Sequence, residues 1–232
     1  MEQGEGGAGA AEVVSRAGGV NGVMGEGAGR HEEAPEQCAE MLGARQEDDL
    51  ATLIYTSGTT GLPKGVQLTN ANLVASADSW HEVLRHAFPP VGQRRDILWL
   101  PVSHMSGWGI LGQGTTNEYE TWISDPYKLL GIIPEVKPTM LLCVPAYWEK
   151  MYTVALNSSS VPAEQHAKLR EITGGELTFL LSGGAGLKRE VKEFFRAAGI
   201  QMIEGYGLTE CSLNLTMNRL DDFDFDSVGK PM

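Results

Sequence analysis

The most constraining feature of this sequence is a strand–loop–helix–strand pattern in its last third. An apolar run over Leu177–Leu181 predicts a buried strand, and a glycine-rich loop over 182–187 follows it. A helix is expected over Lys188–Ala198, with Gly199 as its C-cap, before a second strand over Ile200–Ile203. Two strands joined by a helix predict a parallel sheet with a right-handed crossover. Ligands of such sheets bind at the carboxyl ends of the strands.

The rest of the chain repeats this alternation of short apolar runs and helical periodicity. Strands are expected at 51–55, 66–68, 97–100, 120–124, 138–143 and 213–217, and helices at 37–42, 70–87, 126–133, 146–156 and 162–172. The run at 51–55 has the length and β-branched content of a buried strand. The sequence therefore predicts an α/β fold, with a parallel-rich sheet flanked by helices.

A second loop with chemical character follows the strand expected over Ala51–Tyr55. The segment 56–65 holds four hydroxyl side chains, three glycines and Lys64. Concave sets of backbone amides bind anions, and a lysine adds a positive point charge suited to phosphate. A plain surface turn is the alternative, but it has no need of the hydroxyls and the lysine. The common nucleotide loop is excluded because Gly65, not serine or threonine, follows Lys64.

A third candidate segment, Glu204–Glu210, directly follows the last strand of the crossover pattern. The Tyr206 ring offers a stacking face, the Thr209 hydroxyl donates a hydrogen bond without charge, and the Glu210 carboxylate is a ligand that magnesium prefers. In isolation, the same residues could form a turn and a helix cap.

His104 is a weaker candidate. It lies just past the strand expected over 97–100, among small residues, where a side chain can line a pocket. A satisfied structural histidine is the alternative, and it is the preferred interpretation for His81 and His86.

Charge and composition exclude several classes of function. The net charge is −12, and residues 1–50 contribute −8 of it through eleven acidic and three basic residues. No basic face for a nucleic acid is expected. The three cysteines lack metal-ligand spacing, and neither a signal peptide nor an apolar run of membrane-spanning length is present. These features predict a reduced, cytoplasmic protein without a transmembrane segment.

The three loops together carry a resemblance to a known family. YTSGTTGLPKGV (55–66) resembles the phosphate loop of the adenylate-forming superfamily, 182–185 resembles its adenine- and ribose-side loop, and EGYGLTE (204–210) resembles a further signature. The resemblance implies that ATP is bound by Thr56, Ser57, Gly58, Thr59, Thr60, Gly61, Lys64, Gly183, Gly184, Ala185, Tyr206, Gly207 and Thr209. It also implies catalytic roles for Lys64, Thr209 and Glu210, and a Mg²⁺ site at Thr56 and Glu210. His104, Gly107 and Trp108 would line the carboxylate substrate pocket.

Two further segments, EVKPT (135–139) and VPAYWEKMY (144–152), resemble the long-chain fatty acyl-CoA synthetase branch. The implied substrates are a fatty acid, ATP and coenzyme A, and peripheral membrane contact is compatible with such substrates. Ala146 stands where that branch has an arginine, and Gly186 where proline is usual. A ligase for aryl or amino acids and a non-catalytic ATP- or AMP-binding module remain as alternatives.

The resemblance covers about residues 47–232. We therefore expect a disordered Gly/Glu-rich leader over 1–46 and an incomplete AMP-binding domain over 47–232. Members of the superfamily have a longer N-terminal part and a C-terminal domain with an adenylation lysine. The expectation is that this chain corresponds to part of such an enzyme, and whether it is active by itself stays open.

Overall fold

The computed structural model describes residues 35–57, 61–84, 88–213 and 215–232. The chain divides into two units, residues 1–49 and residues 50–232, which are described separately. Within the described part of the first unit, α3 (Pro35–Gly43) contains the helix expected at 37–42. Most of the segment predicted as a disordered leader lies outside the described residues.

The main sheet of the second unit is built on three parallel strands. These are β5 (Met140–Cys143), β6 (Phe179–Ser182) and β7 (Gln201–Tyr206), in which Ser182 lies opposite Glu204. The short strands β8 (Thr216–Met217) and β9 (Lys230–Pro231) continue the sheet in the antiparallel sense. The predicted α/β fold with a parallel crossover is confirmed.

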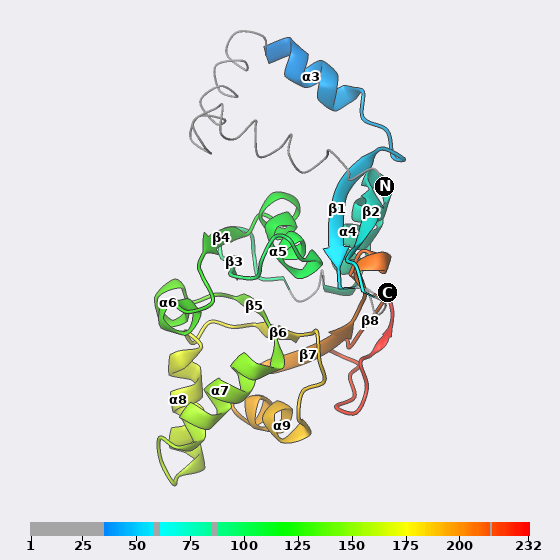
Figure 1. The fold of residues 1–232 in the computed structure, drawn as a ribbon. Coiled ribbons are helices and arrows are strands. Elements are labelled where there is room, and N and C mark those ends of the chain that lie inside the picture. Colours follow the sequence, from blue (N-terminus) through cyan, green and yellow to red (C-terminus); the bar gives the residue numbers. More distant parts are fainter. Residues whose placement is uncertain (1–34, 58–60, 85–87, 214) are drawn as a thin grey trace. The chain divides into compact units, whose positions relative to one another are not determined.

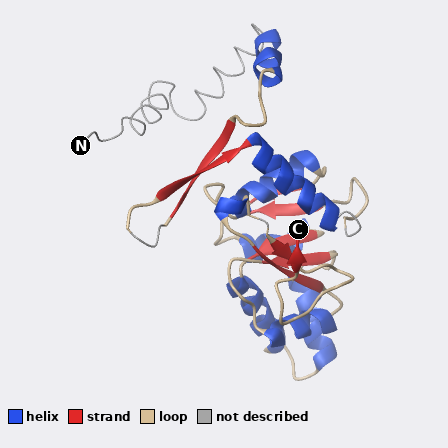
Figure 2. Ribbon diagram, turned by 90° about the vertical axis from the view of Figure 1, so that its right-hand side faces the viewer, coloured by secondary structure: helices blue, strands red, loops and turns tan. Residues whose placement is uncertain are grey.

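Helices cover both faces of this ladder (Figures 1 and 2). On one face lie α6 (Leu129–Val136), α7 (Pro145–Leu156), α8 (Pro162–Ile172) and α9 (Arg189–Ala197). Their core includes Trp148, Met151, Leu169 and Phe195. On the other face, α4 (Asn70–Leu84) contributes Trp80 and Leu84 to a smaller core with Phe179 and Ile203. Burial on both faces explains the continuous apolar runs of these strands.

A second parallel pair, β3 (Arg95–Leu98) and β4 (Glu120–Ile123), lies next to β5. The Thr139 amide, just before β5, donates to the Arg95 carbonyl at 2.9 Å. Between β3 and β4 the chain forms α5 (Met105–Thr116), which the sequence did not predict because of its four glycines. A Cβ at Gly107 would lie 2.3 Å from the Pro101 carbonyl oxygen. Glycine there lets the first turn of the helix lie against the backbone before it.

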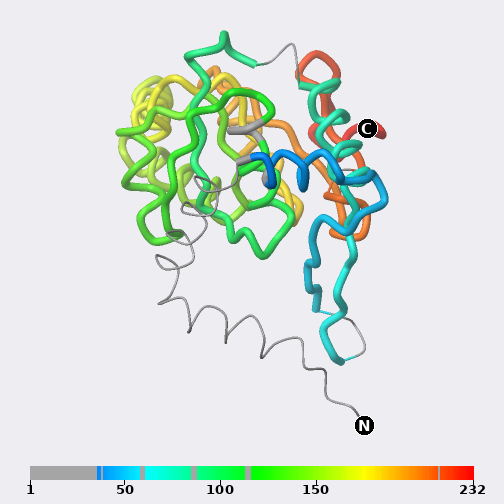
Figure 3. The backbone as a smooth tube through the Cα atoms, turned by 90° about the horizontal axis from the view of Figure 1, so that it is seen from above, coloured from blue at the N-terminus to red at the C-terminus, as the bar shows by residue number. Residues whose placement is uncertain are grey.

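The strand predicted at 51–55 is present, but the prediction that it is buried is wrong. β1 (Leu50–Thr56) pairs antiparallel with β2 (Lys64–Thr69), and these two strands form a separate hairpin. Of its residues only Ile54 and Leu68 are buried, where they pack with Met105. A two-stranded ribbon offers one face to the core, so the apolar residues of its other face stay exposed. Figure 3 shows the hairpin beside the segment that follows β7.

The acidic run 221–226 forms the connection between β8 and β9. Its aspartates are exposed, but Asp222 pairs with Lys230 and Asp226 with Arg189. Arg196 lies over the ring of Phe223, with 4.8 Å to the centroid. No helix of the described residues is long and apolar enough to cross a membrane.

Asp96 on β3 is a buried carboxylate that forms no ion pair among the described residues. It is 2% exposed, and among the described residues neither of its carboxylate oxygens has a hydrogen-bonding partner. Burial raises its pKa from 3.8 to about 7, while the nearby Thr121 hydroxyl lowers it. Because this pKa is raised in the folded protein, the associated stability is fully present below pH 4. It is lost as the pH rises towards 7.

We therefore predict that Asp96→Asn stabilises the protein more at alkaline than at acidic pH. The neutral amide removes the cost of ionisation, so the gain in unfolding free energy is expected to be about 3 kcal/mol larger at pH 8 than at pH 5. Denaturant unfolding at the two pH values measures it, with the exposed Asp221→Asn as the control. An equal gain at both pH values would contradict a raised pKa of Asp96.

Candidate functional site

A cavity of about 710 Å³ lies at the carboxyl ends of β6 and β7. Its lining includes residues from all three segments singled out in the sequence, from Thr56 to Glu210. Of the predicted site residues, those lining the cavity are Thr56, Ser57, Lys64, His104, Gly183, Gly184, Tyr206, Gly207, Thr209 and Glu210. The parallel register of β6 and β7 brings the loop over 182–187 and the segment 204–210 side by side.

The loop after β6 forms one wall of the cavity. Gly184 has a φ of +83°, a backbone conformation that glycine adopts without strain. Ser182 also lines the cavity; it is 2% exposed, and its Oγ has no hydrogen-bonding partner among the described residues. An unpartnered buried hydroxyl suits a polar ligand atom. Ala185, predicted to bind nucleotide, does not line the cavity.

The adjoining wall comes from β7 and the short helix η1 (Thr209–Cys211). The strand runs to Tyr206, three residues beyond its predicted end, and leaves the Tyr206 ring half exposed at the cavity. Thr209 is buried, whereas the Glu210 side chain is exposed. The turn after η1 is held by Ser76 of α4, whose hydroxyl donates to the Ser212 carbonyl at 2.8 Å.

The hairpin contributes the positive charge of the site. Thr56 and Lys64 are register partners where β1 and β2 meet the loop, and both line the cavity with Ser57. The predicted phosphate contacts Gly58, Thr59 and Thr60 lie outside the described residues. Gly61 has a φ of +123° and is not part of the cavity lining.

His104 lies at the start of α5, where its ring has a defined hydrogen bond. The Ser106 amide donates to His104 Nδ1 at 3.2 Å, so in the neutral ring the proton is on Nε2. The two neighbours predicted with it lie elsewhere. Gly107 packs on the Pro101 backbone, and Trp108 packs against the cluster of Ile54, Leu68 and Met105; neither lines the cavity.

Sequence reasoning missed the apolar part of the lining, formed by Trp80, Leu100, Leu142, Val144, Leu181, Leu208, Leu213 and Met217. These residues read as ordinary core positions, and several belong to the core between α4 and the sheet. The strand periodicity of β5 and β6 could have placed Leu142 and Leu181 on the α4 face. Burial raises the pKa of the Cys143 thiol, which also lines the cavity, well above its usual range, so it stays neutral.

The donor set fits a magnesium–nucleotide complex. Among the described residues there is no group of three or more His, Cys, Asp or Glu side chains that could hold a metal ion. Magnesium bound with a nucleotide needs fewer protein ligands, since one or two carboxylates join substrate phosphates and water. Glu210 and Thr56, the predicted pair, both line the cavity and supply one carboxylate and one hydroxyl.

Comparison with known proteins gives consistent matches. Residues 9–232 match the family described as AMP-binding enzyme. The long-chain-fatty-acid–CoA ligase FadD15 of Mycobacterium bovis is 31% identical over 239 residues, which cover 85% of this chain and 39% of the ligase. The chain thus spans about two fifths of the length of this curated relative.

Solved structures give the same picture. O-succinylbenzoate coenzyme A synthetase (MenE) of Bacillus subtilis, in complex with AMP, has a TM-score of 0.61 and 26% identity, over 81% of this chain and 36% of that one. The inhibitor-bound N-terminal domain of FACL13 from Mycobacterium tuberculosis has a TM-score of 0.62 and 25% identity. This match covers 79% of this chain and 44% of that one.

We predict that Gly184→Ala disturbs the cavity wall and that Gly186→Ala does not. An added Cβ at Gly184 is strained at positive φ by about 1 kcal/mol, whereas at Gly186 it would meet no described atom within 4 Å. Thermal unfolding should therefore show a lower unfolding midpoint for Gly184→Ala and an unchanged midpoint for Gly186→Ala. Equal unfolding midpoints for the two variants would contradict the left-handed conformation of Gly184.

Proposed function

The chain belongs to the AMP-binding enzyme family, and from that premise we propose that its cavity binds ATP and a fatty acid for conversion to an acyl-adenylate. Coenzyme A would then accept the acyl group as a thioester. The observation that carries the proposal is the convergence in one cavity of Lys64, the Ser182–Gly184 loop and the Tyr206–Glu210 segment.

In the proposed first step, a carboxylate oxygen attacks the α-phosphorus of ATP, the bond to the bridging β-phosphate oxygen breaks, and pyrophosphate leaves. Negative charge builds on the phosphate oxygens, and fixed donors that face this charge lower the barrier. Lys64 would supply a positive charge and Thr209 a neutral donor. His104, with its proton on Nε2, would donate a hydrogen bond to a substrate oxygen. Bound magnesium, held at Thr56 and Glu210, would neutralise further phosphate charge.

The nucleotide base would stack on Tyr206, beside the loop over 182–184. Tyr206 is half exposed and offers a ring face at the cavity. The backbone of Gly183 and Gly184 carries no side chain that would exclude a flat ring. The AMP complex of MenE, a structural neighbour, supports an adenine nucleotide as the ligand class.

The apolar lining favours a fatty acid as the second substrate. Trp80, Leu142, Leu181 and Met217 present hydrocarbon rather than paired donors to the cavity. The similarity to FadD15, a long-chain-fatty-acid–CoA ligase, favours the same class. The likeness to MenE supports an aryl acid as the competing candidate. Cytoplasmic localisation is part of the proposal, supported by the free thiols of Cys143 and Cys211.

We predict that Lys64→Ala weakens ATP binding more than AMP binding. A charge-assisted hydrogen bond contributes about 1.5–3 kcal/mol, so the dissociation constant for Mg–ATP should rise about tenfold or more. Isothermal titration calorimetry with both nucleotides measures the effect. Lys128→Ala is the matched control, because Lys128 is exposed and does not line the cavity. If both variants weaken Mg–ATP binding equally, the proposed contact between Lys64 and the phosphates is contradicted.

A second prediction concerns the acid. If the acyl chain is buried along Trp80 and Met217, each added methylene should tighten binding about fourfold until the cavity is filled. Pyrophosphate exchange into ATP, measured with saturated acids of increasing length and with benzoate, reports the preference. Exchange with benzoate alone would favour the aryl-acid candidate. Nucleotide binding without exchange for any acid would instead indicate a non-catalytic nucleotide-binding module.

A further inference from the structure

A buried ion pair lies next to the cavity, and neither of its two residues is among the predicted site residues. Lys192 of α9 donates to a carboxylate oxygen of Glu204 on β7 at 2.5 Å, and each of the two side chains is only 7% exposed. Glu204 directly precedes Gly205 and Tyr206, which line the cavity. Two buried charges are expensive to desolvate, so a pair at this position needs a reason beyond stability.

The geometry of Glu204 shows what the pair holds. Its second carboxylate oxygen accepts a hydrogen bond from the Leu187 amide at 2.9 Å. Leu187 is buried and is the last residue of the loop over 183–187. This loop follows Ser182, the last residue of the neighbouring strand β6. Ser182 and Glu204 are register partners, so the start of the loop is fixed by the sheet and its end by the Glu204 side chain. Glycines at 183, 184 and 186 give this loop little stiffness of its own.

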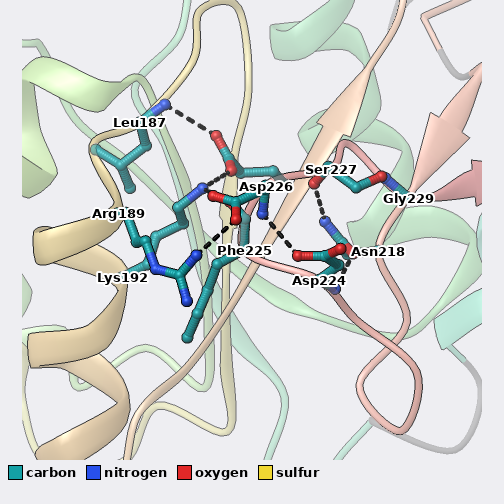
Figure 4. A network of polar contacts seen from close by, with 10 residues as sticks. Leu187, Arg189, Lys192, Asn218, Asp224, Phe225, Asp226, Ser227 and Gly229 are labelled. Carbon is teal, nitrogen blue, oxygen red and sulfur yellow. Dashed lines mark hydrogen bonds and ion pairs between the residues drawn. The ribbon is translucent and has the colours of Figure 1, made fainter.

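The same residue is tied to the connection between β8 and β9. The Glu204 carbonyl accepts from the Asn218 amide at 2.9 Å, and the Asn218 side chain donates to the Ser227 carbonyl at 2.6 Å. Lys192 also donates to the Phe225 carbonyl. Figure 4 shows this network, with Leu187 and Lys192 on one side and Asn218 and Ser227 on the other.

We propose that Glu204 is a positioning residue, which fixes the loop over 183–187 in the conformation that receives the nucleotide. Lys192 holds one oxygen of the Glu204 carboxylate, so that the other oxygen faces the Leu187 amide. This inference rests on the proposed function only in naming a nucleotide as the ligand. The anchoring of the loop is a property of the chain without ligand.

Two double variants separate the anchor from the stability of the ion pair. Lys192→Met with Glu204→Gln removes both charges and keeps an oxygen acceptor for the Leu187 amide. Lys192→Met with Glu204→Leu removes both charges and the acceptor, and fills the site with hydrocarbon. Neither variant leaves an unpaired buried charge, which a single substitution at either position would do.

The expected result is loss of nucleotide affinity in the Leu variant alone. If the loop occupies its binding conformation about one tenth of the time, the apparent dissociation constant for Mg–ATP rises about tenfold. The Gln variant should stay within about twofold of wild type. Amide hydrogen exchange of residues 183–187, measured without nucleotide, should be faster in the Leu variant alone. Arg189→Ala is the control, because it removes the Asp226 contact at the outer end of the network and spares Glu204.

Several outcomes would overturn the proposal. Equal affinities and equal loop exchange in the two double variants would show that the acceptor does not position the loop. If the Leu variant does not fold, the wild-type protein still decides, because the Leu187 amide must exchange as slowly as the amides of β7. Fast exchange at Leu187 refutes the anchor. Absence of nucleotide binding by the wild-type protein refutes the proposed function instead, while the exchange data judge the anchor separately.

Discussion

The parallel pairing of β5, β6 and β7 is the constraint on which the rest of this structure depends. Parallel neighbours need crossover connections, so α7, α8 and α9 follow from the pairing and cover one face of the ladder. The carboxyl ends of the strands meet at the same edge, where each strand gives way to a loop. The register of Ser182 against Glu204 fixes where two of these loops begin. The cavity lies at that edge because the sheet offers its loops there.

The sequence predicted the structure well where a local pattern of residues is compatible with only one type of element. Short apolar runs predicted β5, β6 and β7, and the crossover pattern predicted that β6 and β7 are parallel neighbours. The same reasoning failed where tertiary contacts decide. Burial of β1 depends on its partner being a two-stranded ribbon, which its own residues do not reveal. Helix α5 forms despite its glycines because Gly107 packs on the backbone of Pro101.

The roles of single residues were less predictable than the location of the site. Trp80 and Met217 line the cavity yet have only the periodicity of core residues, because a pocket wall and a core face obey the same burial rule. Trp108, next to several cavity residues in sequence, turns away into another cluster. Two buried carboxylates also differ in their partners. Glu204 has a lysine and an amide, whereas Asp96 has no hydrogen-bonding partner among the described residues.

The hairpin supplies Thr56, Ser57 and Lys64 to a cavity whose other walls belong to the β5–β9 sheet, and these two sheets are separate. No ladder of backbone hydrogen bonds joins the described strands of one to those of the other. Their union depends on the packing of Ile54, Leu68 and Met105 with the partly buried Leu213. Side-chain packing yields to sliding more readily than a hydrogen-bonded ladder does. The placement of Lys64 relative to Thr209 is therefore set by side-chain packing, whereas that of Tyr206 relative to Ser182 is set by the register of the sheet.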